Sequence, residues 1–151
     1  MGGTIVKKCP TTKPLYCSKD GRFFSVRNMQ ITGEGCIMHE LKTSFSPSQH
    51  DHNGGSAYPC MRNFASRSCH TLIWETWVGP RTPGMEIDHI NGDKMNWSLD
   101  NLEEVTPAEN RKRAILLREL RRNGRDPKQM TRDELQAIFR KYRLVNPATI
   151  E

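Results

Sequence analysis

The sequence lacks the long apolar segments that mark a membrane-spanning or exported protein. No apolar run is long enough to cross a bilayer, and aromatic residues make up only 7% of the 151 residues, so the core is small. The opening stretch, MGGTIVKKCPTTK, has neither the apolar core of a signal peptide nor the Ser or Thr that a myristoylation signal requires. We therefore expect a cytoplasmic protein.

Cysteine is scarce, and its spacing excludes two common uses. The five cysteines include no C-x-x-C pair, and their odd number does not complete a disulfide framework. Neither a zinc ribbon nor a disulfide-stapled fold is indicated, and free thiols are the simplest interpretation. Cys9 and Cys17 could still pair in space, which their spacing does not decide.

Basic residues are plentiful. The formal net charge is +6 and the pI is near 9.2, with a mean hydropathy of −0.72. Such a balance favours a polyanionic partner such as nucleic acid, although many proteins of other functions are mildly basic. The length fits one domain with a small appendage.

Residues 1–66 are expected to form a small β-rich module. Residues 22–27 follow a Lys-Asp-Gly turn and are β-prone, and residues 36–41 alternate in character along their length. Residues 57–61 form a third candidate strand. Residues 44–56 hold Pro, Gly, Ser and Asn without periodicity and are expected to be a loop.

Residues 67–124 are expected to form the core, as a helix, a hairpin and a second helix. Residues 69–78 carry apolar residues near helical spacing, and we assign Trp74 and Trp77 to core packing instead of base stacking. Residues 85–89 and 102–105 are the expected strands of the hairpin. Thr106 and Glu109 form a capping box that starts a helix ending before Gly124.

Residues 125–151 are expected to add a helical extension. A second capping box at residues 131–134 precedes apolar residues at i, i+3, i+4 and i+7, which is typical of an amphipathic helix. This face packs on the core or on another subunit. Its apolar residues are Leu135, Ile138, Phe139 and Tyr142. The whole pattern predicts an α+β fold.

The stretch MEIDHINGDKMNWSLDNLEEVTPAEN carries the candidate site. Asp88 and His89 end the first strand of the hairpin, and Asn110 lies in the first turn of the following helix. A compact hairpin backed by a helix can bring Asp88 and Asn110 together, and their hard oxygens suit Mg²⁺ or Mn²⁺. His89 points to the opposite face of the strand from Asp88.

Three segments within this stretch, at residues 87–93, 100–103 and 105–110, resemble the motif of the HNH endonuclease family. The likeness is greatest to the branch found in phage and intron-encoded homing endonucleases. His89, Asn101 and Asn110 stand twelve and nine positions apart, as in that branch. Residues 16–22 and 69–72 resemble the family's upstream segments more weakly, and the last helix is not covered. A phage-encoded protein would act in the host cytoplasm.

The resemblance implies a ββα-metal nuclease core that hydrolyses DNA phosphodiester bonds and nicks or cuts double-stranded DNA. By residue, His89 matches the general base, and Asp88 and Asn110 match the ligands of one divalent cation, Mg²⁺ or Mn²⁺. Asn101 matches the Asn that holds the hairpin loop and helps to orient His89. His70 matches a supporting His. The last motif position is Asn110 instead of His, which favours an oxygen-preferring metal over zinc.

A basic run follows Asn110, with Glu119 as the sole acid in residues 111–125. Such a run is often a solvated helix face, but its place beside the proposed metal ligand favours contact with DNA phosphates. The candidates are Arg111, Lys112, Arg113, Arg118, Arg121 and Arg122.

Other interpretations stay open. The motif residues could form a hairpin with a polar turn and ordinary caps. His50, Asp51 and His52 could bind a metal with His39 or a cysteine, although a solvated loop is the simpler interpretation.

As a function, the alternatives are a nucleic-acid-binding accessory of a phage complex that does not cut, and a toxin-like or defence nuclease. Cutting both strands would require a homodimer, a second binding event or a partner protein, since one site cuts one strand.

Overall fold

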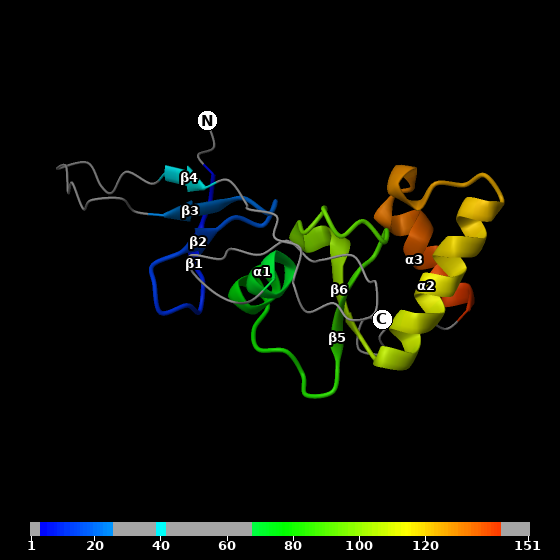
Figure 1. Ribbon diagram of the computed structural model, residues 1–151, viewed down its shortest axis with the longest axis horizontal. Coiled ribbons are helices and arrows are strands. Elements are labelled where there is room, and N and C mark those ends of the chain that lie inside the picture. The colour runs from blue at the N-terminus through cyan, green and yellow to red at the C-terminus, as the bar shows by residue number, and fades with distance from the viewer. Residues whose placement is uncertain (1–3, 26–38, 42–67, 143–151) are drawn as a thin grey trace, which may run out of the picture. The chain divides into compact units, whose positions relative to one another are not determined.

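The computed structural model of the chain describes residues 4–25, 39–41 and 68–142 (Figure 1). The loop and strand expected over 44–61, with His50, Asp51 and His52, lie outside these residues. The described part combines short antiparallel strands with three α-helices, which confirms the expected α+β class. The chain divides into two compact units, residues 1–79 with 97–99 and residues 80–96 with 100–151. In the described ranges, no helix is both long and apolar enough to traverse a bilayer.

The first unit contains a four-stranded antiparallel sheet whose strands are neighbours in sequence order. A turn between the second and third strands is closed by the Ser18 N–H, which donates to the Arg22 carbonyl (2.9 Å). Gly21 within this turn has a φ of 92°, and its carbonyl accepts from Trp97 Nε1 (2.6 Å). The strands are β1 (Lys7–Lys8), β2 (Tyr16–Cys17), β3 (Phe23–Ser25) and β4 (His39–Leu41).

Helix α1 (Cys69–Trp77) belongs to the same unit and begins where the sequence predicts. Its fully buried apolar residues include Leu72 and Ile73. Trp74 and Trp77, which the sequence assigns to packing, are both half-buried. The amines of two lysines lie 6.0 and 5.2 Å from the centre of the Trp77 ring, which places this ring at the surface of the unit.

The described cysteines are free thiols. Cys9, Cys17 and Cys69 are all buried, which agrees with the expected absence of disulfides among them. Cys9 and Cys17 lie next to each other and share a hydrogen bond between their side chains. They are close in space, as the sequence allowed, but are not joined by a disulfide.

The second unit is built on an antiparallel hairpin of β5 (Glu86–His89) and β6 (Leu102–Val105). Asp88 stands opposite Glu103 in the register, and His89 stands opposite Leu102. The expected strands are therefore confirmed to within one residue. Between them, the chain turns at Gly92, which has a φ of 74° that only glycine adopts readily.

Helix α2 (Pro107–Arg122) starts at the capping box that the sequence predicts. The Thr106 hydroxyl accepts from the Glu109 N–H (3.1 Å), and the Glu109 carboxylate accepts from the Thr106 N–H (3.1 Å). These two bonds satisfy donors that the first turn of a helix leaves open. Past Asn123, Gly124 takes a φ of 76° and ends the helix.

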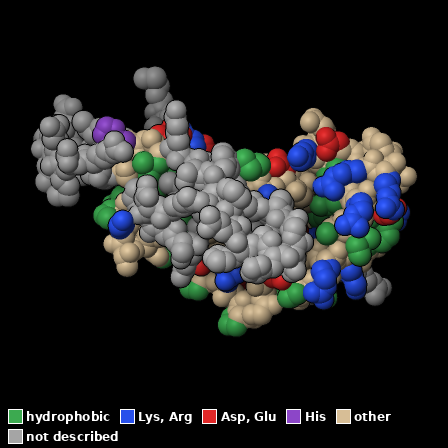
Figure 2. All heavy atoms as spheres, viewed as in Figure 1, with side chains coloured by type: hydrophobic (Ala, Val, Ile, Leu, Met, Phe, Trp, Pro, Cys, Tyr) green, Lys and Arg blue, Asp and Glu red, His purple; other side chains and the backbone are tan. Residues whose placement is uncertain are grey.

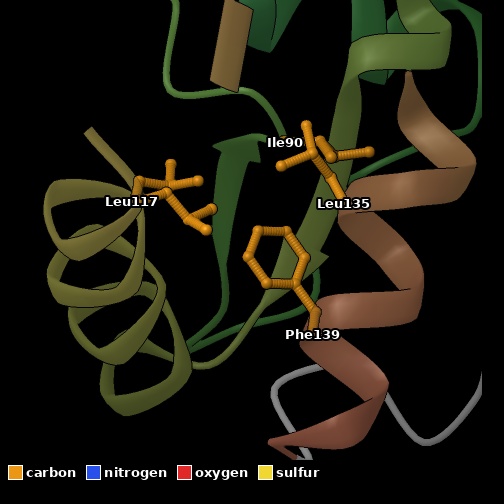
Figure 3. Packing of buried hydrophobic residues seen from close by; sticks show 5 residues of the cluster. Ile90, Leu117, Leu135 and Phe139 are labelled. Carbon is orange, nitrogen blue, oxygen red and sulfur yellow. The ribbon is translucent and has the colours of Figure 1, made fainter. Parts of the chain in front are cut away.

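Helix α3 (Arg132–Lys141) packs against α2 through a buried apolar cluster (Figure 3). Thr131 caps its start by accepting from the Glu134 N–H (3.1 Å). Tyr142, the last residue of the expected apolar face, is the C-cap of the helix and is 55% exposed. The cluster consists of Ile90, Leu117, Leu120, Leu135 and Phe139.

A substitution at Gly92 tests the fit between the hairpin turn and α2. A Cβ built on Gly92 would lie 2.9 Å from Leu117 Cδ1, in addition to its positive φ, whereas a Cβ on Gly124 meets nothing within 4 Å. We expect Gly92→Ala to lower the free energy of unfolding by about 2–3 kcal/mol and Gly124→Ala by about 1 kcal/mol. Urea denaturation measures both, and equal losses would contradict the close approach.

Candidate functional site

The polar residues of the motif lie on the two faces of β5. Glu86 and Asp88 are half-buried and share one face, while Ile87 and His89 are buried on the other. Helix α2 presents Asn110 and, one turn later, Arg113 to the first face. Asn110 contacts Glu86 and Arg113 contacts Asp88, so Asp88 and Asn110 belong to the same side of the hairpin.

Arg113 is the centre of a buried ion network on this side. Its Nη1 donates to Asp88 Oδ2 (3.0 Å), and its Nη2 donates to Glu103 Oε2 (2.7 Å). The side chains of Arg113, Asp88 and Glu103 are only 1%, 13% and 4% exposed. The network therefore ties both strands of the hairpin to α2.

This burial corrects one predicted role. Arg113 was expected to contact DNA with the other basic residues of α2, but its guanidinium is enclosed and engaged by two carboxylates. A side chain held in this way cannot reach a phosphate. Its basic neighbours have a different environment: the exposed candidates are Arg111, Lys112, Arg118, Arg121 and Arg122. Figure 2 shows Lys and Arg side chains gathered over the α2 region.

Asn110 has a partner that the sequence argument missed. Its Nδ2 donates to Glu86 Oε2 (2.6 Å). Because a carboxylate oxygen of this kind accepts and an amide nitrogen donates, the contact fixes which side of the amide faces Glu86 and leaves Oδ1 on the opposite side. The alternation of Glu86 and Asp88 along β5 was the signal that could have revealed this pairing.

Burial sets the pKa of Asp88. Desolvation raises the pKa of this carboxyl to about 6, and the nearby charge of Glu103 acts in the same direction. The charge of Arg113 and its hydrogen bond lower the pKa but do not offset the burial. Asp88 is therefore mostly ionised at pH 7, as a ligand for a cation must be.

His89 is the last residue of β5 and is 5% exposed. Burial, and to a lesser extent the charge of Lys94, lower the pKa of its imidazole to about 4 against a weaker opposing effect of Asp93. The ring is consequently neutral at pH 7. A neutral imidazole has a nitrogen lone pair that can accept a proton.

Asn101 connects the ends of the hairpin loop. Its side chain accepts from the Asn91 N–H (3.2 Å) and donates to Asn91 Oδ1 (3.0 Å) and to the Asn96 carbonyl (2.8 Å). Its carbonyl accepts from the Ile90 N–H (2.8 Å), in the residue directly after His89. These bonds fix the backbone that leads out of His89.

His70 lies in the first turn of α1, in the first unit. Its Nε2 is 3.4 Å from the Ser68 hydroxyl, and its side chain is half-buried. A supporting role toward His89 stays a prediction.

The chemistry of the donors fits a hard divalent cation. Within residues 4–25, 39–41 and 68–142, no three His, Cys, Asp or Glu side chains converge into a complete metal cluster. Asp88 and Asn110 supply one carboxylate and one amide oxygen on a shared face, beside Glu86. Such a sparse set suits Mg²⁺, which often keeps several waters and takes phosphate oxygens as further ligands.

Comparison with known proteins finds a family match over the hairpin region. Residues 67–112 match the family model described as HNH endonuclease. A 41-residue segment is 46% identical to Protein 3.8 of Escherichia phage T7, and this match covers 27% of the chain and 34% of that protein, so about a third of the relative's length is spanned. No solved structure matches the chain.

The buried network predicts a large stability effect at Arg113. Arg113→Leu would leave the carboxylates of Asp88 and Glu103 buried without their guanidinium, and we expect a loss of about 3–5 kcal/mol in the free energy of unfolding. Arg122→Leu is a matched control, since Arg122 pairs with Glu119 at an exposed site (3.0 Å) and should change stability by less than about 0.5 kcal/mol. Urea denaturation distinguishes them, and similar losses would contradict the assigned burial.

The lowered pKa of His89 predicts an imidazole that stays neutral in mild acid. NMR titration of its ring signals should give no change between pH 8 and pH 5.5 and a midpoint near pH 4. Because the unfolded chain binds this proton near pH 6.5, His89 should reduce stability as the pH falls from 6.5 through 4. A midpoint near 6.5 in the folded protein would show that the ring is not desolvated.

Proposed function

We propose that the chain is a metal-dependent endonuclease that hydrolyses phosphodiester bonds in double-stranded DNA, because residues 67–112 match the HNH endonuclease family model. The observation that supports this proposal is that Asp88 and Glu86, the partner of Asn110, share one face of strand β5, which ends in the neutral, buried His89. A carboxylate, an amide oxygen and a proton acceptor are the groups that such a hydrolysis requires.

Asp88 and Asn110 would hold the cation, through the carboxylate and through the amide oxygen that Glu86 leaves available. A divalent cation in this position supplies Lewis-acid stabilisation of the phosphate and of the departing 3′ oxygen. Glu86, Asp88 and Glu103 place three carboxylates on this side of the hairpin, where Arg113 pairs with two of them, Asp88 and Glu103. The excess of negative charge supports the binding of a cation.

His89 would act as the general base. Its neutral ring accepts a proton from water as the water oxygen attacks phosphorus, and the bond between phosphorus and the 3′ oxygen breaks. The departing 3′ oxygen takes a proton from solvent. The products are a 5′ phosphate and a 3′ hydroxyl. Asn101 would keep His89 aligned through its hydrogen bonds to the adjoining loop.

The exposed basic side chains of α2 would bind the phosphates that flank the cleavage point. They lie on the helix that begins with the segment carrying Asn110, so contacts to the DNA backbone and to the cation come from one rigid element. Such contacts position DNA without reading its sequence. One site of this kind cuts one strand, and a single protein molecule is therefore expected to nick. The match to a phage protein supports a phage setting.

A supercoiled-plasmid assay tests the proposal. Wild-type protein with Mg²⁺ or Mn²⁺ should produce relaxed circles, EDTA should prevent this, and His89→Ala should lower the rate by at least about 100-fold because the proton acceptor is lost. DNA affinity, measured by electrophoretic mobility shift in EDTA, should be nearly unchanged in His89→Ala.

Two results would contradict the assignment. Cleavage by His89→Ala at the wild-type rate would remove His89 from the reaction. Salt-sensitive DNA binding by wild-type protein, with no cleavage of phage or host DNA in either metal, would favour the nucleic-acid-binding accessory module instead.

A further inference from the structure

We propose that the C-terminal helix α3 is a positioning element of the site, and that Gln136 is the residue through which it acts. Gln136 is a positioning residue in this proposal, because it touches neither the metal ligands nor the expected reacting atoms. The inference rests on the proposed function and concerns a part of the chain that the family match does not reach, since that match ends at residue 112.

The contacts form a continuous chain from α3 to Asp88. Gln136 Nε2 donates to Glu103 Oε2 (2.9 Å), and the same oxygen accepts from Arg113 Nη2 (2.7 Å). Arg113 Nη1 in turn donates to Asp88 Oδ2 (3.0 Å). Each link is a direct hydrogen bond, and Gln136 is 8% exposed, so water does not compete freely for its amide.

A second residue of α3, Phe139, restricts the orientation of the Arg113 guanidinium. Arg113 Cζ lies 4.4 Å from the centre of the Phe139 ring, which is fully buried. An aromatic face beside a guanidinium stabilises the cation and restricts its rotation. Gln136 and Phe139 stand three positions apart and therefore lie on the same side of the helix.

The consequence for Asp88 follows from the geometry of a carboxylate. Arg113 engages Oδ2, and the orientation of this contact determines where Oδ1 points. A metal ligand that is held in place before the cation binds loses less conformational entropy on binding. Removing a residue that holds a ligand in this way typically lowers metal affinity or activity about 10- to 100-fold. Loosening α3 should therefore weaken the cation site without removing a ligand.

The test is Gln136→Met, which keeps the length and unbranched shape of the side chain but removes the donor. We expect the Kd for Mn²⁺, measured by isothermal titration calorimetry on the full chain without DNA, to rise about tenfold. The kcat of plasmid nicking should fall by a similar factor while KM for DNA stays constant, because the DNA-contacting surface of α2 is unchanged. A merely structural role for Gln136 would lower the melting temperature and leave both quantities unaltered below it.

Two variants control the experiment. Gln129→Met makes the same chemical change at an exposed position outside the network and should alter neither Mn²⁺ affinity nor kcat. The exchange of Glu103→Gln with Gln136→Glu reverses donor and acceptor while conserving charge: the new amide at position 103 can donate to the new carboxylate and still accept from Arg113. This double variant should recover most of the affinity that the single Gln136→Glu variant loses.

The outcomes separate the two proposals. If wild-type protein binds Mn²⁺ and loses it on Asp88→Ala, but Gln136→Met binds and cuts like wild type, the role of α3 is overturned and the proposed function stands. If the exchanged double variant folds but binds Mn²⁺ no more tightly than Gln136→Glu, the proposal that α3 acts through the hydrogen bond between residues 103 and 136 is overturned. Absence of both Mn²⁺ binding and cleavage in wild-type protein would overturn the proposed function and this inference together.

Discussion

The burial of Arg113 between two carboxylates is the constraint on which the second unit depends. A guanidinium removed from water is tolerated only when its charge and its donors are satisfied, so Asp88 and Glu103 must both face α2. Their opposed positions in the register of the hairpin make this possible. A slip of one residue in either strand would turn one carboxylate to the other face and leave Arg113 with a single partner.

The same constraint separates the chemistry on the two faces of β5. On the face toward α2, carboxylates and the Asn110 amide create a polar and negatively charged surface suited to a cation. On the opposite face, burial lowers the pKa of His89 to about 4 and keeps its ring neutral at pH 7. Asp88 is thus ionised and His89 neutral although they are neighbours in sequence. Their side chains lie on opposite faces because side chains alternate along a β-strand.

Much of the second unit was predictable from local sequence. The capping box at Thr106, the N-cap at Thr131 and the turns at Gly92 and Gly124 depend on residues near in sequence, and the structure confirms them. The predicted hairpin strands are also present. The environments of Arg113 and Glu86 could not be predicted from local sequence. The two carboxylate partners of Arg113 lie 10 and 25 positions away in sequence, and Asn110 lies 24 positions from Glu86. The sequence of a basic run is the same whether one of its side chains is buried or all of them face solvent. Tyr142 shows the same limit, since periodicity does not state where a helix ends.

The proposed function requires that the side of the hairpin facing α2 binds one divalent cation through Asp88 and Asn110. A crystal structure of the full chain grown with Mn²⁺, with anomalous differences collected at the manganese edge, tests this directly. We expect one peak in contact with a carboxylate oxygen of Asp88 and with Oδ1 of Asn110, with Arg113 still bound to the other Asp88 oxygen. A peak bound to other residues, or a well-ordered site that stays empty at saturating Mn²⁺, would contradict it.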